Sequence, residues 1–169
     1  MNASDIFKYG DLTMLGTLEQ VPQTEWETAG VCGWWSVKDI VAHLASYEVL
    51  LVDVLYGFCG GDRPTLTLTA FLQAHVAFND DQVAQRAKQT PAQTLAEYSA
   101  AHAEVMKLVA QISAETLRQP GTLPWYGLEY SLDDYFVYQY YGHKREHMAQ
   151  VNVFWDTRKQ SVSQTETRA

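Results

Sequence analysis

The stretch from Ser36 to Phe58, SVKDIVAHLASYEVLLVDVLYGF, has the pattern of one long helix in a protein core. It begins with Ser-x-x-Asp, in which the Ser36 hydroxyl accepts a hydrogen bond from an early backbone amide and Asp39 lies at the positive helix end. The apolar residues continue as far as Gly60 and Gly61, which are typical of a helix stop. We therefore predict that this stretch forms a core helix.

Other segments also show apolar residues at helical spacing. One begins with Thr90, a capping residue, followed by Pro91 at the first helical position. The last begins with Ser131, again in a Ser-x-x-Asp pattern. No segment alternates apolar and polar residues over the length of a strand. We predict an all-α fold with a four-helix core and with further helices over residues 3–19, 68–88, 90–112 and 131–158.

The composition is that of a globular domain rather than a disordered chain. The 169 residues are 47% hydrophobic and 19% charged, and a single domain near this size buries roughly 70% of the surface of its unfolded chain. We place one domain at residues 1–158. Residues 159–169 are polar and lack apolar periodicity, so we expect them to form a tail.

The charge of the chain argues against a nucleic-acid partner. Asp and Glu number 20 against 12 Lys and Arg, which gives a formal net charge of -8, and the basic residues do not cluster. A protein that binds nucleic acid needs a positive surface to displace counterions from phosphate. We expect no nucleic-acid partner.

The sequence also gives no sign of export or membrane insertion. The start, MNASDIFKYG, lacks the basic and apolar regions of a signal peptide. The most apolar run, residues 49–58, is shorter than a membrane span and contains Asp53. Cys32 and Cys59 have no Cys-x-x-Cys spacing, and we expect both to be reduced thiols. We predict a soluble, cytoplasmic protein with no membrane partner.

Two histidines four residues apart occur near the C-terminus, in YGHKREHMAQ, residues 141–150. This spacing places the side chains of His143 and His147 one turn apart on the same helix face. The face is otherwise rich in aromatic residues, which indicates that it looks inward. His43 lies on an inward face of the helix that begins at Ser36. Three imidazoles from two helices are therefore predicted to point into the bundle.

Such a set is typical of a metal site but does not prove one. Three nitrogen ligands leave positions open for water or substrate, which is the arrangement of a catalytic metal centre. Histidines at this spacing also occur without metal, and one inward histidine is often a hydrogen-bonded core residue. His75 has no histidine partner four residues away, and His102 lies in an alanine-rich turn, so we predict that neither is a ligand. Periodicity leaves the metal and the metal-free interpretation open.

Two motifs resemble those of the DinB-like (YfiT-like) superfamily of metal-binding four-helix bundles: GWWSVKDIVAHLA, residues 33–45, and YYGHKREHMAQ, residues 140–150. The family pattern is Trp-[Ser/Thr]-x-x-[Asp/Glu]-x-x-x-His on the second helix and His-x-x-x-His on the last, and the resemblance covers about residues 3–156. It implies an up-down-down-up bundle with short extra helices. It also implies that His43, His143 and His147 bind a divalent metal ion, zinc or nickel in relatives, and that the chain forms a homodimer.

Residues 71–86, FLQAHVAFNDDQVAQR, resemble the thiol-dependent branch, which includes mycothiol-dependent maleylpyruvate isomerase and related S-transferases. Members of that branch have an asparagine followed by an arginine about two turns later, here Asn79 and Arg86. The resemblance implies a small-molecule substrate and a low-molecular-weight thiol as cofactor. Two functions remain open: a hydrolase or thiol S-transferase that activates water or a thiol against a small electrophile, and a non-catalytic bundle that binds a small molecule or metal under stress.

Helix phase further predicts residues that orient the ligand rings or line the pocket. These residue types are also common as structural hydrogen-bonding groups. Trp125 and Tyr126, in a loop with proline and glycine, are predicted to form the pocket rim. The predicted neighbours of the histidines are Tyr47, Asn79, Gln139 and Gln150, together with Asp39 and Glu48.

Overall fold

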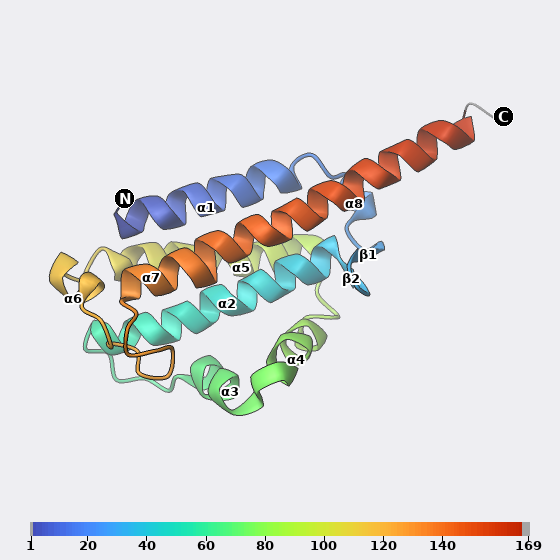
Figure 1. Ribbon diagram of the computed structural model, residues 1–169. Coiled ribbons are helices and arrows are strands. Elements are labelled where there is room, and N and C mark those ends of the chain that lie inside the picture. Colours follow the sequence, from blue (N-terminus) through green and yellow to red (C-terminus); the bar gives the residue numbers. More distant parts are fainter. Residues whose placement is uncertain (1, 167–169) are drawn as a thin grey trace.

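The computed structural model describes residues 2–166, except for the side chains of His75 and of residues 162–166. Four long helices form a bundle, and Figure 1 shows that the first and the last run in one direction while the middle two run in the other. This is the predicted up-down-down-up order, and the all-α prediction is confirmed. The helices are α1 (Ala3–Leu18), α2 (Val37–Phe58), α5 (Pro91–Val109) and α8 (His143–Glu166).

Side-chain caps begin the helices where the sequence predicts. Asp39 accepts hydrogen bonds from the backbone amide and the hydroxyl of Ser36, at 2.9 and 2.7 Å. Thr90 and Gln93 form the corresponding capping box at the start of α5. Each box satisfies backbone amides that have no partner within the helix. The starts of α2 and α5 are thus defined by local sequence.

The chain returns along the bundle between α2 and α5 through a broken segment rather than the single helix predicted for residues 68–88. It consists of α3 (Leu66–Ala74), a 3₁₀ turn and α4 (Phe78–Gln85). Asp53 of α2 accepts hydrogen bonds from the amides of Thr67 and Leu68, at 2.8 and 3.2 Å, and so anchors the first turn of α3. No proline or glycine marks the break, which therefore arises from packing on α2.

The connector between α1 and α2 contains a small antiparallel ribbon that the sequence analysis does not predict. Its strands are β1 (Ala29–Cys32) and β2 (Trp35–Ser36), and they follow a 3₁₀ turn at Gln23–Glu25. Gly33, with a φ of 59°, supplies the left-handed conformation that the tight turn between the strands requires. Strands this short do not contain enough residues to show an alternation of apolar and polar side chains in the sequence. A further short helix, α6 (Ala114–Arg118), follows α5.

The last long segment begins at the Ser131 cap and continues through α7 (Leu132–Phe136) and a π-helical segment (Val137–Gly142) into α8. Helix α8 runs to Glu166, beyond the helix end at residue 158 that the sequence predicts, so part of the predicted polar tail is helical. Adding a residue to an existing helix costs far less than nucleating one. A Lys159–Asp156 ion pair at 2.7 Å adds local support. Residues 167–169 lie outside the described residues.

Helix α2 forms the centre of the core. Ile40, Leu50 and Leu55 are fully buried, and α2 packs mainly on α5 while α1 packs on α8. Among the described residues α2 is long and apolar enough to cross a membrane, but 83% of its most apolar stretch is buried in the bundle. This is the property of the core helix of a soluble protein.

Candidate metal centre

Three histidine rings from two helices converge in the bundle interior. The Nε2 atoms of His43 and His143 are 2.9 Å apart, and those of His143 and His147 are also 2.9 Å apart. One ligand atom from each of the three residues lies within 4.8 Å of the others. His43 comes from the first half of α2, whereas the other two lie on consecutive turns of α8. The structure thus brings together the three histidines that the sequence predicts to face inward.

The π-helical segment directly precedes His143 and sets the direction of that ring. A π turn inserts one extra residue into a helix and is frequent at functional sites. A Cβ atom on Gly142 would lie 3.2 Å from the carbonyl oxygen of Val137, five residues earlier. Glycine therefore relieves crowding inside the π turn. His143 and His147 follow in regular α-helix, so one adjustment directs both rings.

The outer nitrogens of two rings hold protons. His147 Nδ1 donates to Gln150 Oε1 at 2.8 Å, and the His143 ring donates to the backbone carbonyl of Gln139. When these imidazoles are neutral, their Nε2 atoms carry no proton and present lone pairs to one another. His43 Nδ1 is buried and has no hydrogen-bond partner within the described residues.

Burial keeps the rings neutral. Desolvation, followed by the charges of His143 and His147, lowers the pKa of His43 to about 2. Desolvation and His147 likewise lower the pKa of His143 to about 4. The pKa of His147 is also lowered by burial. At neutral pH none of the three is therefore charged. The single proton of the neutral His43 ring lies either on Nδ1, which has no acceptor among the described residues, or on Nε2, where it is shared with His143 Nε2.

This donor set fits a divalent metal ion. Zinc binds imidazole nitrogen at about 2.0–2.1 Å, so two ligands at right or tetrahedral angles are roughly 2.9 to 3.4 Å apart. The spacing of 2.9 Å between neighbouring Nε2 atoms lies in that range. A cation between the rings would also remove the repulsion between lone pairs. The cluster therefore has the chemistry and the spacing of a metal-binding site.

Comparison with known protein families agrees with this geometry. Residues 12–151, most of the chain, match the family model of the DinB superfamily. This chain belongs to the DinB superfamily. No curated protein and no solved structure matched it.

In this DinB protein, aromatic side chains enclose the histidines. The His43 ring lies between Trp35 and Tyr47, with centroids 5.0 and 4.8 Å away. Beyond Tyr47, the rings of Phe71 and Phe78 are 6.2 and 6.0 Å from it and belong to α3 and α4. The broken segment thus supplies an apolar wall next to the histidine cluster.

Two of the predicted neighbours form a polar pair within that wall. The Tyr47 hydroxyl donates to Asn79 Oδ1 at 3.2 Å, and the Tyr47 ring lies 4.8 Å from that of His143. Burial raises the pKa of Tyr47, so its hydroxyl stays protonated. The structure therefore brings a neutral donor and an amide beside the histidines.

The two predicted glutamines differ in how they contact the rings. Gln150 uses its side chain, whereas Gln139 uses its backbone carbonyl. The side chain of Gln139 instead hydrogen-bonds the Tyr126 hydroxyl. Asp39 caps α2 and does not contact the histidines. Helix phase predicts the face on which a side chain lies, but it does not predict which atom of the residue forms the contact.

Arg86, the second residue of the thiol-branch pattern, has structural partners. Its guanidinium contacts Glu97 Oε1 at 2.6 and 3.0 Å and bonds the backbone and side chain of Gln82 at 3.0 Å. These bonds attach the end of α4 to α5. The side chain is buried and its donors are directed at these groups.

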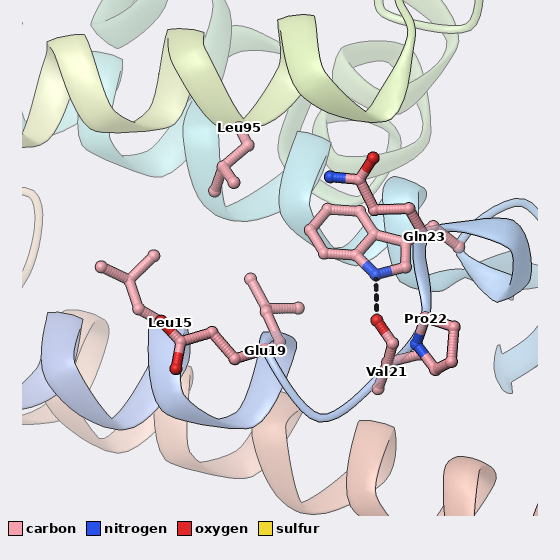
Figure 2. A pocket seen from close by; sticks show the side chains of 8 residues that line it. Leu15, Glu19, Val21, Pro22, Gln23 and Leu95 are labelled. Carbon is pink, nitrogen blue, oxygen red and sulfur yellow. Dashed lines mark hydrogen bonds between the residues drawn. The ribbon is translucent and has the colours of Figure 1, made fainter.

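A cavity of about 380 Å³ lies away from the histidines, at the end of α1. Figure 2 shows Leu15 of α1 facing Leu95 of α5 across it, and the indole nitrogen of Trp26 donates to the Val21 carbonyl at 3.0 Å. None of the three histidines lines it. This cavity is thus separate from the candidate metal centre.

Proposed function

We propose that this chain is a metal-dependent enzyme in which His43, His143 and His147 bind one divalent ion and the site activates water or a thiol against a small electrophilic substrate. The observation that carries the proposal is the convergence of three Nε2 atoms, with the Nδ1 proton of His147 already used in an outward hydrogen bond to Gln150. Zinc and nickel are the proposed ions, because both are well matched to imidazole nitrogen.

The neutral ligand set supports a catalytic rather than a purely structural role. Three neutral imidazoles leave the full charge of a divalent ion uncompensated, and three protein ligands leave a position open. When bound, the ion supplies positive charge that lowers the pKa of water or a thiol. Gln150 and the Gln139 carbonyl hold two rings in the tautomer that directs Nε2 inward.

The residues around the histidines support a small substrate with an apolar part. Phe71 and Phe78 form a wall that excludes water and packs against apolar groups. The Tyr47 hydroxyl and the Asn79 amide offer hydrogen bonds to a polar atom of the substrate, such as the oxygen of a carbonyl group. In this proposal the chain itself orients and desolvates the substrate.

Turnover assays on metal-loaded protein test the proposal. The thiol reaction is measured with chlorodinitrobenzene and low-molecular-weight thiols, including mycothiol and glutathione, and the hydrolytic reaction with nitrophenyl esters. We expect turnover in one assay that is lost on chelation, restored by zinc or nickel, and absent in His43→Ala. Protein that binds one ion but turns over neither class of substrate would contradict catalysis and favour the non-catalytic metal-binding bundle.

A further inference from the structure

A second polar cluster has at its centre Glu48 of α2 and Lys144 of α8, the two helices that carry the three histidines. We define the Glu48 cluster as Asp11, Glu48, Tyr98, His102 and Lys144. Glu48 is fully buried and Lys144 is 2% exposed. Their Oε1 and Nζ atoms are 2.6 Å apart. The other carboxylate oxygen of Glu48 lies 3.2 Å from His102 Nδ1.

The outer members of the cluster extend these contacts to all four long helices. The Tyr98 hydroxyl donates to Asp11 Oδ1 at 3.0 Å, and His102 Nε2 lies 4.0 Å from Asp11 Oδ2. The Lys144 ammonium is 5.2 Å from the centroid of the Tyr98 ring. Asp11 belongs to α1, Glu48 to α2, Tyr98 and His102 to α5, and Lys144 to α8. The cluster therefore links the four helices near the middle of the bundle.

Stability alone does not explain an ion pair at this position. Transferring two charges from water into the protein interior is costly, and apolar side chains of similar volume often replace a buried pair without loss of stability. The best-established role of such pairs is to select one register among competing packings. The relevant question is then which alternative packing of this bundle the pair disfavours.

The π-helical segment identifies that alternative. The π turn contains one more residue than an α-helical turn. If Val137–Gly142 became ordinary α-helix, that residue would become part of the regular helix, and every later side chain would be rotated about the helix axis by about 100°, the rotation of one residue. The positions that now direct His143 and His147 at His43 would then be taken by their neighbours. The histidine contacts are between uncharged nitrogens, so in the metal-free protein they oppose this shift less than a buried ion pair does.

Lys144 lies in the right place to oppose it. It directly follows His143, so the two side chains leave α8 about 100° apart. On α2, Glu48 lies five residues after His43, about 7.5 Å further along the helix axis. Two contacts at different angles and heights fix both the rotation and the translation of α8 relative to α2. A charged pair in the interior tolerates no such shift, because each charge would lose its partner.

We propose that Glu48 and Lys144 are positioning residues of the metal centre, whose ion pair holds α8 in the register that directs His143 and His147 at His43. This inference rests on the metal site of the proposed function. Glu48 also favours metal binding electrostatically. Its carboxylate neutralises the ammonium group of Lys144, which is adjacent in sequence to the proposed metal ligand His143. The pair touches neither the ion nor the substrate.

Cobalt titration of a double variant tests the inference. In Glu48→Met/Lys144→Met both charges are absent and the volume is nearly kept, so we expect the metal-free protein to unfold at a denaturant concentration equal to or above that of the wild type. We expect its cobalt dissociation constant to rise roughly 10- to 100-fold, the range seen when residues that orient ligands are changed. The visible cobalt spectrum should change in position or intensity, because the ligand geometry changes.

A more conservative double variant, Glu48→Gln/Lys144→Met, guards against a folding defect. Its amide keeps a hydrogen-bonding group toward His102 while the ion pair is lost, and we expect the same weakening of cobalt binding. The matched control is Arg86→Met/Glu97→Met, which removes a partly buried pair, at 2.6 Å, that joins α4 to α5 and leaves α8 untouched. This control should keep the cobalt affinity and spectrum of the wild type.

The outcomes separate this inference from the proposed function. Wild-type cobalt affinity and spectrum in both Glu48/Lys144 variants would overturn the positioning role and leave the metal site intact. A wild-type protein that binds no cobalt would overturn the metal site and the positioning role together. Weakened binding in the Arg86/Glu97 control to the same degree would assign the effect to general loosening of the bundle and would also overturn the inference.

Discussion

The bundle interior contains two polar clusters that differ in how their groups are paired. In the Glu48 cluster, a carboxylate meets an ammonium at 2.6 Å and an imidazole at 3.2 Å, so charge is balanced within the protein. In the histidine cluster, three uncharged rings place neighbouring Nε2 atoms 2.9 Å apart, and His43 Nδ1 has no partner among the described residues. Both lie between α2 and α8.

The difference indicates which cluster needs a ligand. A buried polar group without a partner costs free energy, and proteins retain such groups mainly where something binds. The Glu48 cluster pairs its two buried charges within the protein, although the geometry of the pair leaves Glu48 Oε1 and Lys144 Nζ without a hydrogen bond among the described residues. The histidine cluster pairs no charges within the protein, and under the proposed function a cation completes it. The predictions below contrast the clusters in stability, metal affinity and pH dependence.

The largest expected difference concerns stability without metal. Lys144→Met leaves Glu48 buried with only His102 as a partner, and we expect it to destabilise the metal-free protein by about 3–5 kcal/mol. His143→Ala leaves no charge unpaired and should cost less than about 2 kcal/mol. Denaturant unfolding of both variants without metal measures the difference. Equal losses would show that the two clusters do not differ in this way.

A second contrast separates two glutamines in their effect on metal affinity. Gln150→Leu removes the acceptor that fixes the tautomer of His147, and we expect metal affinity to fall roughly 10- to 100-fold. Gln139→Leu is the matched control, because His143 uses only the backbone carbonyl of that residue. Competition with a chelating dye measures both dissociation constants. Similar losses in the two variants would refute the assignment of the tautomers.

The pH dependence of stability should differ between the clusters. The folded pKa of His43 is lowered to about 2 by desolvation and by its histidine neighbours. As pH falls, His43 is therefore protonated in the unfolded chain before it is protonated in the folded one. The free energy of unfolding decreases as pH falls below 6.5, the pKa of His43 in the unfolded chain. We expect a loss of about 2 kcal/mol from His43 between pH 6.5 and pH 5 in the metal-free protein.

Protonation of Glu48 should reduce stability only at a lower pH than protonation of His43 does. Burial raises its pKa, but Lys144 and His102 outweigh burial and the net pKa is lowered from 4.5. Its stabilising contribution is therefore present above about pH 4.5 and is lost below it. Unfolding of wild type and His43→Ala at a series of pH values resolves the two ranges. A wild-type loss above pH 5 that persists unchanged in His43→Ala would contradict this account.

The smallest expected effect concerns the π-helical segment. Gly142→Ala places a methyl group 3.2 Å from the Val137 carbonyl oxygen, and the backbone must shift by a few tenths of an ångström. We expect metal affinity to fall by less than about tenfold. Gly16→Ala in α1, where no atom lies within 4 Å of the added carbon, should leave affinity unchanged. An unchanged affinity in Gly142→Ala would show that the π turn tolerates a side chain.

Local signals made the main helices predictable from sequence. The capping patterns at Ser36, Thr90 and Ser131 mark helix starts that the structure confirms. The inward direction of His43 follows from a period of 3.6 residues, which does not depend on distant contacts. Motif resemblance then led to the DinB superfamily, which the family comparison confirms.

The features that sequence reasoning missed depend on tertiary contacts. The break between α3 and α4 has no proline or glycine and follows from packing against α2. The π turn before His143 changes helix phase without a residue type that demands it. The pairing of Lys144 and His102 with Glu48 could not be predicted. A charged side chain is buried where a partner is present, and Glu48 lies 96 residues before Lys144 in the chain. A pattern within one helix carries no information on that pairing.

The metal content of purified protein tests the central claim most directly. Wild-type protein and the variant His143→Ala/His147→Ala are each loaded with zinc, desalted and analysed by elemental mass spectrometry. We predict one divalent ion per chain in the wild type and background content in the variant. Equal content in the two proteins, or none in the wild type, would contradict the assignment of this cluster as a metal centre.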